Sequence, residues 1–201
     1  MLTEIVLLAG EVEGPHLAEI LRRDHPEMAV VTAVDQESLA AACETPSLPG
    51  GRRLVSFCTS VIVPSKVLDA LTGPAYNFHP GPPEYPGAHA ASFAIYDATK
   101  AFGVTVHEMA EKVDAGPIVA VQRFDIPEKA RFMDLELLAY RVMVGMFHDL
   151  AGRLAGDEAP LPVINETWGP KKTTEADFER MRLYDQNTSE AEITRRFRAF
   201  G

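Results

Sequence analysis

The sequence has few cysteines, few basic residues and no long apolar run, and each scarcity excludes a class of protein. Two cysteines in 201 residues are too few for a disulfide framework, which predicts a reducing, cytoplasmic compartment. We interpret both, Cys43 and Cys58, as inert core residues. The 19 basic and 29 acidic side chains give a net charge of -10, which disfavours a nucleic-acid partner. The apolar runs are too short for a transmembrane helix and the N-terminus lacks the basic region of a signal peptide, so we expect no membrane partner.

Strand-like and helix-like segments alternate along most of the chain. Apolar runs typical of buried strands occupy 5–8, 28–34, 54–58 and 75–79, with helical spacing between them at 15–24, 37–43 and 64–71. This alternation predicts an α/β fold with a doubly wound, mostly parallel sheet. Two further β-rich runs, 103–109 and 117–125, predict an antiparallel strand pair, and helical periodicity follows at 132–154. We expect a main domain at 1–158 and a short C-terminal extension at 159–201, irregular except for a polar helix at 190–200.

The most distinctive stretch covers residues 76–87, Tyr-Asn-Phe-His-Pro-Gly-Pro-Pro-Glu-Tyr-Pro-Gly. Because side chains alternate along a strand, Asn77 and His79 project from one face while Tyr76 and Phe78 point to the other. The prolines that follow keep the loop out of helix and ladder, so it is stiff. A stiff loop loses little entropy when a substrate binds, as a well-positioned site requires.

Other polar residues carry weaker signals. Gly10 and Gly14 lack the G-x-G-x-x-G pattern, and the glutamates between them would repel a phosphate, so we read a turn and assign no dinucleotide. Asp114 lies in the loop between the two β-rich runs, where an aspartate is more often a turn former than a catalyst. His89 and His107 are interpreted as structural or surface residues. No short-range ligand pattern is present, so we predict no metal site.

Four motifs together resemble one family, the 10-formyltetrahydrofolate-dependent formyltransferases. That family includes the enzymes that formylate glycinamide ribonucleotide, methionyl-tRNA and amino-sugar nucleotides. The resemblance covers about residues 2–155 and implies a Rossmann-like fold, 10-formyltetrahydrofolate as formyl donor and a primary amine as acceptor. The motifs are Asn77-x-His79-Pro80, Tyr85-Pro86-Gly87, Gly103-Val-Thr-Val-His-x-Met and Val113-Asp114-x-Gly116-Pro117-Ile118.

The resemblance also implies roles for individual residues. Asn77 and His79 would donate hydrogen bonds to the formyl oxygen, where negative charge develops during transfer. Asp114 would take the proton of the attacking amine and favour protonated His79. The remaining assignments are the cofactor-binding residues Val61, Ile62, Met109, Ala110, Glu111 and Val113, and the substrate-binding residues Gly10, Gly81 and Pro82.

Departures from the family pattern narrow the acceptor. Glu11 and Glu13 replace the loop that binds the ribose phosphate in glycinamide ribonucleotide enzymes, and Gly81-Pro82-Pro83 replaces the longer loop of the tRNA enzymes. A small amine remains, with an amino-sugar nucleotide favoured. A formyl hydrolase and a non-catalytic folate-binding domain stay open as alternatives, as does a homodimer.

Overall fold

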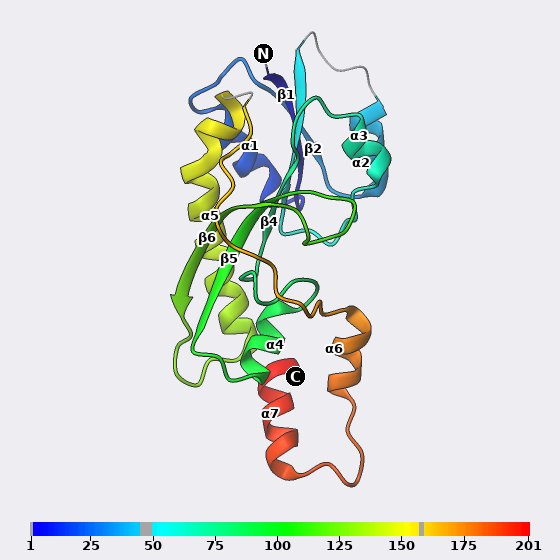
Figure 1. The fold of residues 1–201 in the computed structure, drawn as a ribbon, viewed down its shortest axis with the longest axis vertical. Coiled ribbons are helices and arrows are strands. Elements are labelled where there is room, and N and C mark those ends of the chain that lie inside the picture. The colour runs from blue at the N-terminus through cyan, green and yellow to red at the C-terminus, as the bar shows by residue number, and fades with distance from the viewer. Residues whose placement is uncertain (1, 45–49, 157–158) are drawn as a thin grey trace.

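The computed structural model describes residues 2–44, 50–156 and 159–201 and shows one mixed β-sheet flanked by helices (Figure 1). Within these residues the strand order is β2-β1-β3-β4-β5-β6; β1 to β4 are parallel, and β5 pairs antiparallel with both β4 and β6. The doubly wound, mostly parallel sheet with an antiparallel pair is confirmed. The strands are β1 Leu2–Leu8, β2 Ala29–Ala33, β3 Gly51–Phe57, β4 Tyr76–His79, β5 Ala101–Glu108 and β6 Ile118–Asp125.

Helices pack on both faces of the sheet. The helices α1 and α5 share a hydrophobic cluster with one face, and α2 and α3 share a smaller cluster with the other. None of the helices in the described residues is both long enough and apolar enough to span a bilayer. The helices are α1 Gly14–Arg22, α2 Gln36–Glu44, α3 Ser65–Asp69, α4 Ala90–Tyr96, α5 Phe132–Gly156, α6 Glu175–Arg182 and α7 Glu190–Phe200.

Strand β4 divides its side chains between the two faces as predicted. Tyr76 and Phe78 are fully buried in the larger cluster, where the Phe78 ring lies 5.7 Å from Phe57 and 5.2 Å from Phe147. The Tyr76 hydroxyl accepts a hydrogen bond of 2.7 Å from the backbone N–H of Leu161. This contact ties the chain that follows α5 to the centre of the sheet. The opposite face of β4 carries the polar side chains of Asn77 and His79.

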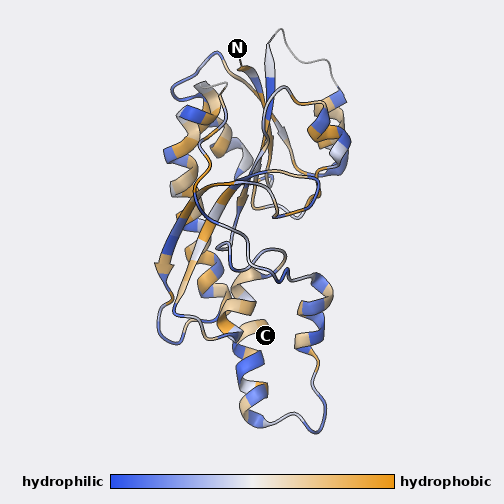
Figure 2. Cartoon of the chain, in the orientation of Figure 1, coloured by the Kyte–Doolittle hydropathy of each residue, from blue (hydrophilic) through white to orange (hydrophobic). Residues whose placement is uncertain are grey.

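The C-terminal extension is more regular than the sequence analysis expected. The polar helix at 190–200 is confirmed as α7, whose last residue Phe200 is buried against Phe93 of α4. Helix α6 was missed. Its start is fixed by a capping box in which Thr174 accepts from the Asp177 N–H and the Asp177 carboxylate accepts from the Thr174 N–H. Both helices are predominantly hydrophilic (Figure 2), so hydrophobic periodicity gave no sign of α6.

Candidate active site

Four polar side chains form a block on the face of β4 and β5 that points away from the larger cluster. In the antiparallel register Asn77 lies opposite His107, and His79 lies opposite Thr105. Directly opposed residues of an antiparallel pair share a face. The Asn77 Nδ2 atom is 3.1 Å from His107 Nε2. The interpretation of His107 as an ordinary structural or surface residue was therefore incomplete, since it is buried within the candidate site.

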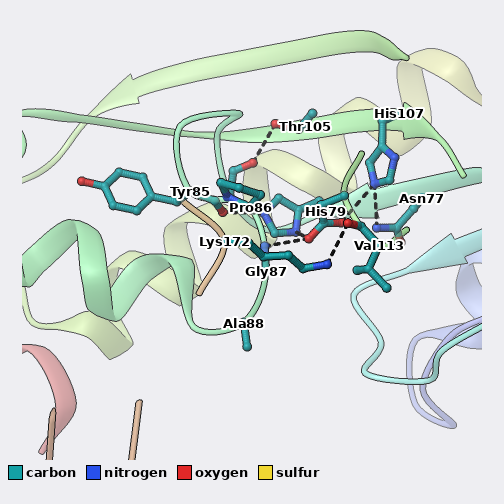
Figure 3. Close-up of polar contacts among 12 residues, drawn as sticks. Asn77, His79, Tyr85, Pro86, Gly87, Ala88, Thr105, His107, Val113 and Lys172 are labelled. Atoms are coloured by element: carbon teal, nitrogen blue, oxygen red, sulfur yellow. Dashed lines mark hydrogen bonds and ion pairs between the residues drawn. The ribbon is translucent and has the colours of Figure 1, made fainter. Parts of the chain in front are cut away.

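Asp114 approaches this block from the loop between β5 and β6. Its backbone has φ +47°, and its side chain is buried. One carboxylate oxygen, Oδ2, accepts a 2.8 Å hydrogen bond from the Gly87 N–H and lies 3.6 Å from His79 Nδ1. The other, Oδ1, lies 3.3 Å from His107 Nε2. Figure 3 shows Asn77, His79 and His107 close to the loop after β4 and the strand β5. The contacts of Asp114 with both histidines therefore bring the three residues predicted to act together to one place.

Backbone carbonyls set which ring nitrogen of each histidine carries a proton. His79 Nε2 lies 3.0 Å from the Tyr85 carbonyl, and His107 Nδ1 lies 2.8 Å from the Glu108 carbonyl. A carbonyl only accepts, so each of these nitrogens is the N–H donor. The opposite nitrogen of each ring, His79 Nδ1 and His107 Nε2, consequently faces Asp114.

The pKa values of the two central groups both move downward. Burial alone would raise the pKa of Asp114, but its close contact with His107, the charge of His79 and the Gly87 N–H outweigh burial and lower the pKa to about 2. Burial lowers the pKa of His79 below its ordinary 6.5, although the charge of Asp114 and the Tyr85 carbonyl act in the opposite direction. The expectation that Asp114 favours protonated His79 is correct for that pair alone, but desolvation dominates.

The loop after β4 is held by close backbone approach. The Thr105 hydroxyl donates to the Gly81 carbonyl at 2.7 Å, and a Cβ at Gly81 would come within 2.6 Å of His79 Nε2. Gly87 has φ +97°, and a Cβ there would collide with the Thr173 carbonyl. Any side chain at either glycine would displace a ring or a carbonyl that shapes the site.

A cleft of about 1120 Å³ opens in front of the block, with Asn77, His79 and Asp114 in its wall. All six residues assigned to the cofactor line this cleft, whereas Gly10, Gly81 and Pro82 are not among its lining residues. The Gly10 N–H instead donates a hydrogen bond to the Glu13 carboxylate. Gly81 lies next to the His79 ring, where a Cβ would meet Nε2. Cys58, expected in the core, is exposed and lines the cleft, with φ +49°.

The lining of the cleft combines apolar and charged side chains. Its apolar residues include Val61, Ile62, Leu68 and Met109. Among the polar residues of the lining, burial raises the pKa of Glu136. His89, also in the lining, stacks on Phe178 at 3.7 Å and pairs with Glu175 at 2.8 Å, so it is held in place by α6.

Comparison with protein families bears on the same segment of chain. Residues 54–137 match the family model described as formyl transferase, and this range contains Asn77, His79, His107 and Asp114. Over this segment the chain is similar to formyl transferases. Among the residues that the structure describes, no group of His, Cys, Asp and Glu side chains could hold a metal ion.

Curated relatives match this chain over only part of their own length. Methionyl-tRNA formyltransferase of Enterococcus faecalis is 29% identical over 145 residues, which are 69% of this chain and 44% of that protein. That of Streptococcus agalactiae is 30% identical over 146 residues, 72% of this chain and 46% of that protein. Phosphoribosylglycinamide formyltransferase of Bacillus subtilis is 28% identical over 96 residues, 47% of this chain and 49% of that protein. The chain spans about half or less of these relatives.

Solved structures similar to this formyl transferase fold match over nearly the whole chain. A sugar N-formyltransferase from Shewanella has a TM-score of 0.79 at 14% identity, covering 99% of this chain and 88% of that chain. The Helicobacter canadensis N-formyltransferase in complex with folinic acid and dTDP-3-aminofucose has a TM-score of 0.72 at 17% identity. The match covers 100% of this chain and 81% of that chain. HypX from Aquifex aeolicus in complex with tetrahydrofolic acid has a TM-score of 0.63 at 23% identity. The match covers 99% of this chain and 34% of that chain. This likeness confirms the Rossmann-like fold.

Proposed function

We propose that the chain is an N-formyltransferase that moves a formyl group from 10-formyltetrahydrofolate to a primary amine of a small molecule. The observation that carries the proposal is the convergence of Asn77, His79 and Asp114 on one wall of a large cleft. An amino-sugar nucleotide is the favoured acceptor, because neighbours in fold are sugar N-formyltransferases and one was solved with an amino-sugar nucleotide.

The cleft fits a formyl-folate in size and in the character of its lining. A volume of about 1120 Å³ is slightly above the roughly 300–1,000 Å³ of ordinary small-molecule sites. Val61, Ile62 and Met109 offer apolar surface to a flat ring, and residues 109–113 also line the cleft. The donor supplies an activated formyl group, bonded to nitrogen, that an amine can attack.

Asn77 is placed to stabilise the charge that develops on the formyl oxygen. Its amide carries two N–H donors, of which one faces His107, so a second is available to the cleft. One donor of this kind is worth about 10²–10³ in rate. His107 holds the amide through Nε2 and is itself fixed by the Glu108 carbonyl, so Asn77 is oriented before substrate arrives.

Asp114 and His79 together can carry one proton from the incoming to the leaving nitrogen. The carboxylate, ionised at neutral pH because its pKa is about 2, takes the proton that the amine loses as the new C–N bond forms. His79 Nδ1, 3.6 Å away and unprotonated at rest, accepts that proton and passes it to the nitrogen whose bond to the formyl carbon breaks. Protons balance, and each residue returns to its starting state.

The experiment is to mix the protein with 10-formyltetrahydrofolate and follow release of tetrahydrofolate, with and without a panel of amino-sugar nucleotides and simple amines. Release that requires one amine supports the proposal and names the acceptor. Release in the bare mixture indicates a formyl hydrolase, and binding of folinic acid without release under any condition indicates a folate-binding domain. His79→Gln, which removes the proton carrier, is the matched inactive control.

A further inference from the structure

The C-terminal extension packs against part of the polar block on β4 and β5, beside the cleft. On this face α2 and α3 pack against β1, β2 and β3, while the segment 159–174 runs along β6 and the loop after β4 toward α6 (Figure 1). It is joined to them by the Ile164 N–H donating to the Ile118 carbonyl and by an ion pair between Glu166 and Arg123.

Trp168, the only tryptophan in the sequence, lies where this segment passes the two histidines. The centroid of its indole ring is 5.7 Å from that of His79 at an interplanar angle of 75°, and 5.0 Å from that of His107 at 89°. Both are edge-to-face arrangements at the separations aromatic rings prefer. The indole Nε1–H donates to the Gly116 carbonyl at 2.9 Å, two residues after Asp114.

The indole is anchored on both sides. The Gly169 N–H that follows it donates to the Pro83 carbonyl, so its backbone is fixed to the loop after β4. Trp168 is not among the residues that line the cleft, whereas both histidines are. The imidazoles therefore lie between the indole and the space that substrates would occupy.

We infer that Trp168 is a positioning residue for the formyl-transfer reaction, holding the imidazoles of His79 and His107 in register with Asp114. The inference rests on the proposed function and extends its site to residues beyond the stretch that matches the family model. An imidazole whose ring nitrogen must face a carboxylate at 3.6 Å needs both its tilt and its rotation fixed. The carbonyls of Tyr85 and Glu108 fix one atom of each ring, and contact with the indole fixes the plane.

The test compares Trp168→Leu and Trp168→Phe with Phe200→Leu, a control that removes the aromatic ring of the extension that packs on Phe93 of α4. Trp168→Leu is expected to lower kcat about 10²-fold, since misplacement by about 1 Å can cost that much, with little change in KM for the formyl donor. Trp168→Phe keeps a ring and loses only the hydrogen bond to Gly116, so an intermediate kcat is expected. Phe200→Leu lowers the melting temperature and leaves kcat within about twofold of wild type.

A second measurement needs no turnover. Imidazole nitrogen NMR of the folded variants reports the proton position and pKa of each histidine. Trp168→Leu exposes His79 to water and is expected to raise its pKa toward 6.5, since burial is what lowers it. The charged or titratable groups that face the indole and the rings are His79, His107, Asp114 and Lys172.

The outcomes separate the two proposals. Absence of transfer by wild type with every amine refutes the proposed function, and the NMR comparison then decides the role of Trp168. Transfer by wild type with equal kcat in Trp168→Leu and Phe200→Leu overturns the inference, as does an unchanged His79 titration in Trp168→Leu.

Discussion

Replacing Asp114 by Asn tests the electrostatics of the site most directly. Asn has nearly the same shape, and its carbonyl oxygen can still accept from the Gly87 N–H, so the loop keeps its anchor. The negative charge between His79 and His107 is lost. With no carboxylate to take the proton of the amine, kcat is expected to fall about 10²–10⁴-fold, whereas KM for the formyl donor changes little.

The same variant carries a prediction for stability. The pKa of Asp114 falls from 3.8 to about 2 on folding, so its ionised form favours the folded state by about 2 kcal/mol at neutral pH. Because the folded pKa is the lower one, this contribution is complete well above pH 3.8 and is lost as the pH falls through about 2. About half of it remains at pH 3. The Asn variant lacks this pH-dependent part.

The assay is urea unfolding followed by circular dichroism at pH 7, 5, 4 and 3, run on wild type, Asp114→Asn and Asp69→Asn, a control at an exposed position on α3. The difference in free energy of unfolding between wild type and Asp114→Asn should shrink by about 1 kcal/mol between pH 5 and pH 3. A constant difference over that range, or a kcat within threefold of wild type, refutes the reasoning.

Three further predictions concern the frame of the site. Gly87→Ala forces a Cβ onto the Thr173 carbonyl at φ +97°, and we expect at least about 2 kcal/mol lost by urea unfolding together with a tenfold lower kcat; full activity would contradict the assigned geometry. Tyr76→Phe leaves the buried Leu161 N–H without its acceptor, which should cost about 1–3 kcal/mol in the same unfolding assay with kcat unchanged. Because burial lowers the pKa of His79, neutral His79 persists below pH 6.5, so the acid limb of kcat/KM should have its midpoint under 6.5; a midpoint above that value argues against His79 as the resting base.

Much of the fold could be predicted from local sequence patterns. Apolar runs and helical spacing marked the strands and most helices, and the alternation on β4 placed Tyr76 and Phe78 in the core and Asn77 and His79 opposite them. Helix α6 was not predicted because its sequence is too polar to show hydrophobic periodicity. The Thr174-x-x-Asp177 spacing of its capping box was the available signal.

The site was predictable only where motifs carried it. Recognition of the family pointed to Asn77, His79 and Asp114, but the role of His107 depends on register. An antiparallel pair joining β4 to β5 was needed to place His107 opposite Asn77, and the alternation Val-Thr-Val-His could have suggested that Thr105 and His107 share a face. Trp168 lies 61 residues beyond His107 in the sequence, and no local pattern links them. Such long-range contacts are decided by how the extension packs on the finished sheet.

One line of hydrogen bonds connects that extension to the central carboxylate through Gly87. The Thr173 N–H donates to the Pro86 carbonyl, and the Ala88 N–H donates to the Thr173 carbonyl, so the segment clamps the peptide on either side of Gly87. The Gly87 N–H in turn holds Asp114 Oδ2. Since Gly87 has no side chain and φ +97°, its own preferences cannot keep that N–H aimed at the carboxylate. The two hydrogen bonds of Thr173 must therefore fix the direction of the Gly87 N–H. Any change that loosens residues 168–175 should displace Asp114 before it affects the sheet.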